Sequence, residues 1–286
     1  MNRGAARSPG PGTGTWNPGR VLAGATGGLV LLGLLALLAP WISPYDPSVP
    51  LGLGSLRLVP PGMEHPLGTD RLSRDVLSRV LHGGRVSLLV GVFGAVVALV
   101  LGVAVGLVSG FFGGWVDRVS MAVVDVFLAF PRLVLLIVVA ALFRPSPWVL
   151  VGVLGFTLWP PIARLVRAEV LSVRDRGYVH AAEALGLGRI RILLRHVLPN
   201  VIAPVVVAGT LVVGDAVVLE AGLSFLGLGM PAGVPSWGAM IYEGLADPVD
   251  SWWVSVFPGI AIVATVLCVN LLGEGLRARI GPEGAG

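Results

Sequence analysis

The chain contains no lysine, a single cysteine and few charged residues of either sign. Only 13% of its residues are charged, about half of the ~25% that is typical of soluble domains. All 20 basic residues are arginine. A P-loop needs a lysine to reach the phosphates of a nucleotide. We therefore do not expect this chain to hydrolyse ATP by that route.

The lone cysteine, Cys268, excludes a disulfide within the chain and a cysteine-based zinc site. The sequence has four histidines but no H-E-x-x-H motif, and it has no G-x-S-x-G motif. We expect no catalytic constellation, no metal site and no cofactor held by this chain. Arginine beside membrane spans explains the net charge of +4 better than nucleic-acid binding does.

Apolar residues are abundant and lie in long runs. They make up 55% of the chain, and its 41 glycines fit membrane helices, where glycine is frequent. The first run, Val21–Ile42, has the length of a spanning helix. A cleaved signal peptide is the alternative, but the run is long for one and Pro40-Trp41 is a poor cleavage site. The sequence predicts an all-α polytopic membrane protein with six transmembrane helices: Val21–Ile42, Val86–Phe112, Val119–Phe143, Trp148–Leu171, Val201–Leu228 and Trp252–Leu276.

Between these runs the chain divides into four parts. Residues 1–20 predict a disordered tail, 21–85 the first span with a polar outer loop, 86–276 a five-helix core, and 277–286 a second tail. In the outer loop, apolar residues recur at helical spacing opposite charged ones. This pattern predicts a short amphipathic helix at a membrane interface. Its apolar residues are Leu72, Val76, Leu77 and Val80, and its charged residues are Arg71, Arg74, Asp75 and Arg79.

The arginines also predict the orientation of the chain. If the N-terminus is cytoplasmic, the cytoplasmic pieces hold thirteen arginines, Arg164 and Arg167 among them, and the outer pieces hold six. Cytoplasmic loops carry the excess of positive charge, so both termini and residues 172–200 are expected in the cytoplasm. The chain is expected in the cytoplasmic membrane, in contact with lipid.

Residues 172–200 form the most polar stretch between two spans. Good helix formers predict one helix over Asp175–Leu185, which Gly186 and Gly188 end. A second short helix follows over Arg189–Val197, and Pro199 is expected to prevent its continuation. The segment is therefore a helix, a glycine hinge and a helix that leads into the fifth span.

Two features of this segment bear on its role. Ala181 and Ala182 offer a small face that another protein could approach closely, and Arg191 and Arg195 share a face at i,i+4 spacing. From these residues alone, an amphipathic loop on anionic lipid and a protein-docking element both remain open.

The pattern AA-x3-G-x9-H-x-LPN resembles the EAA loop of permease subunits in binding-protein-dependent ABC importers. The resemblance implies a coupling helix that sits in a groove of an ATPase subunit. The usual glutamate is His180 here, so the specific salt bridge of that residue is not expected. The coupling residues it implies are His180, Ala181, Ala182, Gly186, Arg195, Leu198 and Pro199.

Other stretches resemble the same permeases over residues 21–282. They include HPLGTDRLSRDVLSRVLHGGRVSL (65–88), AFPRL (129–133), EAGLSFLGLG (220–229) and NLLGEGLRARI (270–280). The likeness is to the peptide/nickel branch, and within it to the second permease subunit of dipeptide and oligopeptide importers. It implies a second homologous permease subunit, two ATPase subunits that bind the ATP, an extracytoplasmic binding protein, and short peptides as substrate. Nickel or another small solute is the alternative substrate.

Charges within spans are functional candidates because burying them is costly. Asp125, Arg132, Asp215 and Glu220 are the candidates for a translocation path. Asp125 and Arg132 are expected about two turns apart on one helix, each with a partner on another helix. For Glu220 and Asp215 the alternative is a buried contact that holds helix packing.

Two further patterns predict packing and charge. Glycines at positions 91, 94, 102 and 106 predict close packing between helices. Glu220, Glu243, Asp247 and Asp250 form a loose acidic group toward the outer side. That group would attract a cationic substrate or contact a binding protein, or else lie in a solvated loop.

Two rival functions remain from the sequence. An ion-coupled secondary carrier would need Asp125 or Asp215 for coupling, and its transport would survive loss of any ATPase. An integral-membrane enzyme or assembly scaffold would use residues 172–200 as a regulatory loop.

Overall fold

The computed structural model describes residues 18–52, 56–231 and 233–280. Within these ranges every named element is helical, which confirms the predicted all-α class. The predicted tails lie mostly outside them, and residues 18–20 belong to the first helix. The elements are α1 (Pro18–Leu37), α2 (Ala39–Ile42), α3 (Val76–Phe112), α4 (Gly114–Ala129), α5 (Arg132–Ala141), α6 (Pro147–Arg174), α7 (Gly177–Ala184), α8 (Arg189–Ile192), the π-helix η1 (Leu193–Val197), α9 (Leu198–Phe225), α10 (Trp237–Gly244) and α11 (Trp252–Ile280).

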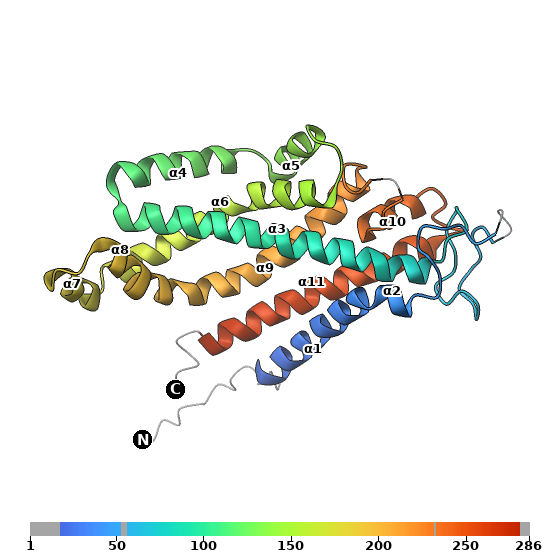
Figure 1. Ribbon diagram of the computed structural model, residues 1–286, viewed down its shortest axis with the longest axis horizontal. Helices are drawn as coiled ribbons and strands as arrows, with labels where there is room; N and C mark the ends of the chain where they lie inside the picture. Colours follow the sequence, from blue (N-terminus) through green and yellow to red (C-terminus); the bar gives the residue numbers. More distant parts are fainter. Residues whose placement is uncertain (1–17, 53–55, 232, 281–286) are drawn as a thin grey trace, which may run out of the picture.

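Helix α3 lies at the centre of the bundle. It packs against α6 along much of its length and also contacts α9. Helix α11 packs against α9, and α1 packs against α11. The long helices follow the long axis of the molecule (Figure 1). One end of that axis carries α7 and α8, and the other carries α10 and residues 43–52 and 56–75. The start of α1 and the end of α11 point toward the α7–α8 end.

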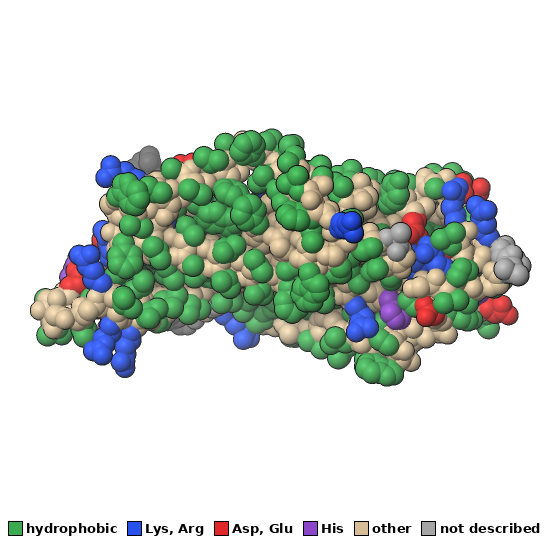
Figure 2. Space-filling view, turned by 45° about the horizontal axis from the view of Figure 1, so that its top comes forward, with side chains coloured by type: hydrophobic (Ala, Val, Ile, Leu, Met, Phe, Trp, Pro, Cys, Tyr) green, Lys and Arg blue, Asp and Glu red, His purple; other side chains and the backbone are tan. Residues whose placement is uncertain are grey.

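Among the described residues, five helices are long and apolar enough to cross a membrane, and a sixth span is obtained if α4 and α5 are taken together. A broad apolar surface covers the middle of the molecule, and charged side chains gather toward its two ends (Figure 2). The chain is therefore a polytopic membrane protein. The five helices are Gly19–Leu37, Val76–Phe112, Pro147–Arg174, Arg189–Phe225 and Trp252–Arg279.

The predicted third span, Val119–Phe143, is broken. Helices α4 and α5 meet at an angle of 89°. Proline disfavours a helical conformation in the residue before it, and Phe130, before Pro131, is extended at φ −84° and ψ 138°. The expectation that Asp125 and Arg132 share one helix is therefore wrong, because the break puts them on α4 and α5.

The predicted interfacial helix in the outer loop is also wrong. Helix α3 begins at Val76 and continues into the bundle as one helix of 37 residues. Asp75 caps it by accepting a hydrogen bond from the Ser78 amide at 2.8 Å. Two of its predicted charged residues are not turned to solvent or lipid headgroups, since Arg74 and Arg79 are only 6% and 1% exposed.

These two arginines are buried because carboxylates meet them. Arg79 Nη1 donates to Asp70 at 2.6 Å and to Glu243 at 2.5 Å. Arg74 donates to the same two carboxylates at 2.7 and 2.8 Å. We call Asp70, Arg74, Arg79 and Glu243 the outer ion cluster. It ties the loop before α3 to α10.

The predicted acidic group on the outer side is not a pool of free negative charge. Glu243 belongs to the outer ion cluster, and Asp247 pairs with Arg71. Glu220 is fully buried within the bundle. Of the four acids in the group, Glu220 and Asp250 have no ion pair among the described residues, and only Asp250 of these two is exposed.

The predicted glycine packing is confirmed. A Cβ on Gly102 would lie 2.6 Å from Ile162 Cβ, and one on Gly106 would lie 2.6 Å from the Ala163 carbonyl oxygen, both on α6. A Cβ on Gly91 would lie 2.4 Å from Val217 Cγ2 on α9. The backbone of α3 can approach its two neighbours this closely only where no side chain intervenes.

Candidate functional site

In the segment 172–200, the last residues of α6 are followed by α7, which packs against the bundle through its inner face. Val179 and Ala182 are buried there, at 0% and 5% exposure. The helix ends in a Schellman motif: the Gly186 amide donates to the Glu183 carbonyl at 2.9 Å, and the Leu187 amide donates to the Ala182 carbonyl at 3.2 Å. Gly186 has φ +76°, a conformation that favours glycine, so the predicted helix stop is confirmed.

The second predicted helix does not stop at Pro199. Helix α8 passes into the π-helix η1, Leu193–Val197, and then directly into α9, whose second residue is Pro199. Proline has no N–H for a carbonyl one turn earlier, but it is tolerated in the first turn of a helix. Residues 189–225 therefore run as one long helix, with the π-turn just before the proline.

The outer face of this segment is exposed and mixes apolar and basic side chains. Leu185 is 82% exposed, Ile190 67% and Leu194 56%. Arg189, Arg191 and Arg195 are also exposed. We call these six residues, with Tyr178 and Ala181, the α7–α8 surface.

The two alanines of the motif do not form one exposed face. Ala181 is exposed, whereas Ala182 packs into the core of its own chain, so the expectation of an accessible pair is wrong for Ala182. Residues 181 and 182 are about 100° apart around a helix, and α7 turns only one of them inward. His180 lies 3.6 Å from Glu183, with both side chains more than half exposed.

Three ion pairs link α4 and α5 to α6 and α9. The two more exposed pairs have side-chain exposures of 44–64%, and the third is more covered, at 17% and 31%. They are Asp125–Arg164 at 2.5 Å, Arg132–Asp215 at 3.0 Å and Asp117–Arg167 at 2.5 Å. We call them the charged face. The prediction that Asp125 and Arg132 each have a partner on another helix is confirmed.

Half of the residues of the charged face are not among the predicted site residues. Arg164 and Arg167 are expected among the cytoplasmic arginines, but both lie within α6, in a candidate membrane span. The signal was present, because Arg164 and Arg167 are at i,i+3 spacing and so point the same way from one helix. Asp117 was not singled out.

Glu220 is not part of the charged face. Its side chain is fully buried, and its Oε1 accepts a hydrogen bond from the Ser224 hydroxyl at 2.7 Å. The Ser236 hydroxyl, at the start of α10, lies 3.3 Å from the Ser224 hydroxyl. The geometry favours packing between α9 and α10 over lining a path.

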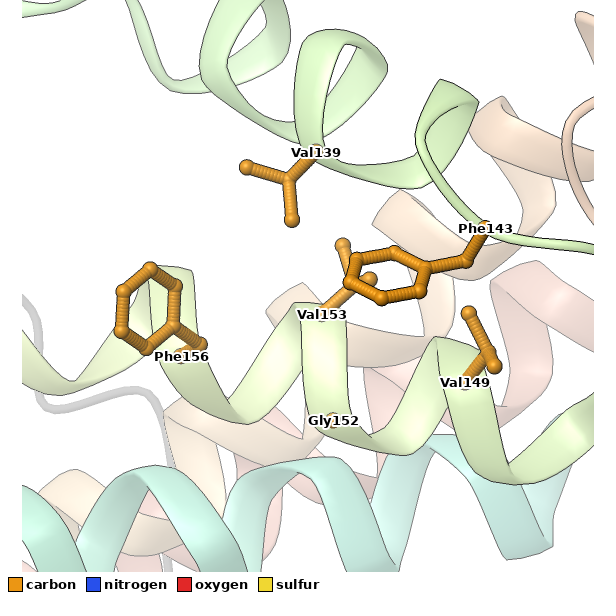
Figure 3. Close-up of a pocket in the computed structure, with 6 residues that line it drawn as sticks. All are labelled: Val139, Phe143, Val149, Gly152, Val153 and Phe156. Carbon is orange, nitrogen blue, oxygen red and sulfur yellow. The ribbon is translucent and has the colours of Figure 1, made fainter.

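An apolar pocket of about 380 Å³ lies between α5 and α6. Figure 3 shows the lining residues, which come from α5, from Phe143 shortly after it, and from α6. Its walls offer no group that could bind the charged ends of a polar solute. It is lined by Val139, Phe143, Val149, Gly152, Val153 and Phe156.

Comparison with known families identifies the chain. Residues 102–283 match the family model described as "Binding-protein-dependent transport system inner membrane component". The chain belongs to this family. This permease component is thus a multi-pass protein of the inner membrane and not an enzyme.

Curated relatives of this permease component cover most of its length. A peptide transport system permease protein of Brucella suis is 41% identical over 89% of this chain and 85% of the relative. The glutathione transport system permease protein GsiD of Escherichia coli (strain UTI89) is 41% identical over 89% and 84%. The di/tripeptide transport system permease protein DppC of Pseudomonas aeruginosa is 37% identical over 91% and 88%.

A solved structure shares the fold. It is an inward-facing form of the MetNI methionine ABC transporter, with a TM-score of 0.56 and 18% sequence identity. The alignment covers 69% of this permease component and 96% of that chain.

Proposed function

We propose that this permease component imports short peptides and that ATP hydrolysed by two separate ATPase subunits drives the import. The substrate class is supported by the relatives at 37–41% identity, which are named as peptide, glutathione and di/tripeptide permeases. ATP is bound by the partner subunits, and this chain holds no cofactor. A second, homologous permease subunit and an extracytoplasmic binding protein complete the importer.

The α7–α8 surface is the observation that carries the coupling proposal. Leu185 and Ile190 project from the segment 172–200 and are 82% and 67% exposed in the described part of the chain. Burying one leucine side chain gives about 1.5–3 kcal/mol, so these residues suit a protein groove. The flanking arginines suit an acidic rim on that groove. This proposal includes a cytoplasmic location for both termini and for this surface.

The continuous helix from Arg189 to Phe225 suits the transmission of motion. Its first turns belong to the α7–α8 surface, and its later turns carry Asp215 on the charged face. Closure of two ATPase subunits would move α7 and α8, and this helix would then tilt as one rod. Such rocking of helix bundles switches access from one side of a membrane to the other.

The charged face supports a partner beside α4, α5 and α9. Half-exposed charges are expensive against hydrocarbon, so such a face is turned to another protein or to water. A homologous permease subunit placed there would cover the face and leave a hydrated path between the two subunits. The outer ion cluster lies at the other end, where the binding protein would deliver substrate.

The direct test is uptake of radiolabelled trialanine by cells that make this subunit, compared with a deletion strain. We expect uptake to require the subunit, to stop when ATP is depleted, and to continue when the ion gradient alone is collapsed. Labelled nickel serves as the second substrate arm. Uptake of nickel but not of peptide would replace the proposed substrate class. Uptake that follows the ion gradient would identify the secondary carrier instead.

A further inference from the structure

The charged face has a composition that the coupling proposal does not explain. Its two more exposed pairs each present one carboxylate and one guanidinium, and their side chains are 44–64% exposed. Arg132, Asp125, Asp215 and Arg164 all lie in candidate spanning segments. A face that only had to pack against a second subunit would be less costly without charge.

The pairs are also spaced along the path. Asp125 lies on α4 and pairs with α6, whereas Arg132 lies seven residues later on α5 and pairs with α9. The α5–α9 pair follows on the far side of the break at Phe130 and Pro131. An extended tripeptide reaches about 10 Å at ~3.3 Å per residue. The two ends of a short peptide are therefore far enough apart to contact different side chains of the charged face.

We propose that the exposed pairs Asp125–Arg164 and Arg132–Asp215 are transient binding points for the charged ends of a peptide in transit. This inference rests on the proposed import of peptides. A free peptide carries an ammonium at one end and a carboxylate at the other, so each end finds its counter-charge in every pair. Because the carboxylate and the guanidinium of each pair cancel, the pair has no net charge that would retain either end of the peptide. The peptide can therefore leave as readily as it enters.

The geometry within each pair allows this exchange. Each of the two pairs has a single hydrogen bond, at 3.0 and 2.5 Å, and the four side chains are 44–64% exposed. Half-exposed ion pairs hold together weakly in water. A substrate charge can therefore replace a partner at small cost. Arg79 in the outer ion cluster is not available for such an exchange, since it is 1% exposed and forms salt bridges with two carboxylates.

The test uses two tripeptides of opposite side-chain charge, Ala-Asp-Ala and Ala-Lys-Ala, with uptake by the complete importer in cells. Arg132→Gln leaves Asp215 alone, so the ratio of Ala-Asp-Ala uptake to Ala-Lys-Ala uptake should fall about fivefold. Asp215→Asn leaves Arg132 alone, so the same ratio should rise by a similar factor. The swapped variant, Arg132→Asp with Asp215→Arg, should restore the wild-type ratio. The same binding protein serves every variant, so its own preference cancels.

The matched control is the pair Arg71–Asp247, which is 39% and 36% exposed but lies at the outer end. Arg71→Gln and Asp247→Asn should leave the ratio unchanged. The amount of each variant in the membrane is followed by immunoblot. Where the variants at Arg132 or Asp215 fail to accumulate, Arg164→Gln and Asp125→Asn provide the second pair of opposite shifts. Wild-type uptake without opposite shifts in either pair overturns the inference and leaves the proposed function standing. Absence of wild-type uptake of any tripeptide overturns the proposed function itself.

Discussion

Arg79 and Glu243 are 164 residues apart in the sequence and form a two-atom ion pair at the outer end of the bundle, with N–O distances of 2.5 and 3.0 Å. The arginine is 1% exposed. Asp70 Oδ2 accepts a further hydrogen bond from Arg79 Nη1 at 2.6 Å. Through this contact the segment before α3 and the short helix α10 are held as one unit.

Removing one partner from this pair should destabilise the protein. Arg79→Gln leaves Asp70 and Glu243 facing only Arg74, and breaking a buried pair costs about 3–5 kcal/mol. We expect a lower unfolding temperature in detergent, measured by the fluorescence of the purified protein. The double variant Arg79→Met with Glu243→Met keeps Arg74 with Asp70, and it should cost less than the sum of the single variants Arg79→Met and Glu243→Met. Strict additivity of the two single effects would contradict the pairing.

Close packing of α3 on α6 should tolerate no side chain at Gly106. A Cβ there would lie 2.6 Å from a backbone oxygen, so Gly106→Val should cost about 3 kcal/mol through overpacking. Gly152→Val is the matched control on α6, because nothing lies within 4 Å of a Cβ at that position. Thermal unfolding in detergent should separate the two variants. Equal unfolding temperatures would contradict the observed helix contact.

The two alanines of the EAA-like motif should respond differently to the same substitution. Ala182 is buried in its own chain, so Ala182→Arg should lower the amount of folded protein in the membrane. Ala181 is exposed, so Ala181→Arg should leave the protein folded and lower uptake through a blocked contact. Immunoblots of membranes and trialanine uptake distinguish these outcomes. Loss of folded protein in both variants would contradict the assignment of faces on α7.

The proposed orientation can be read by cysteine labelling. In a Cys268→Ser background, Arg191→Cys should react with a membrane-impermeant maleimide only after the cells are opened. Asp250→Cys, near the start of α11, should react in intact spheroplasts. Both positions are exposed, so burial does not limit the reaction. The reverse pattern of labelling would show that the α7–α8 surface faces outward.

Sequence patterns predicted well what depends on neighbours in the chain. The helix stop at Gly186 and the close packing at Gly102 and Gly106 follow from local spacing. The break at Phe130 and Pro131 was equally local, and the rule for residues before proline predicts it. The prediction of a single span over Val119–Phe143 instead rests on the continuous apolar run, in which Pro131 lies.

Long-range pairing was beyond the sequence patterns. The charged residues before α3 predicted a surface helix, because nothing near them indicates a partner as distant as Glu243. Similarly, the spacing of Ala181 and Ala182 does not state which of the two faces the bundle. Pro199 was read as a stop, although proline is tolerated in the first turn of a helix and the preceding π-turn lets the helix continue.

The most direct test of the central claim is the effect of one exposed leucine on ATPase binding. Leu185 and Val249 are both 82% exposed, one on the α7–α8 surface and the other at the opposite end. The measurement is co-purification of ATPase subunits with the tagged permease, together with trialanine uptake. The account predicts that Leu185→Asp lowers both at least about tenfold, since it loses ~1.5 kcal/mol or more of apolar burial, while Val249→Asp changes neither. Normal ATPase binding and uptake by Leu185→Asp would contradict the account.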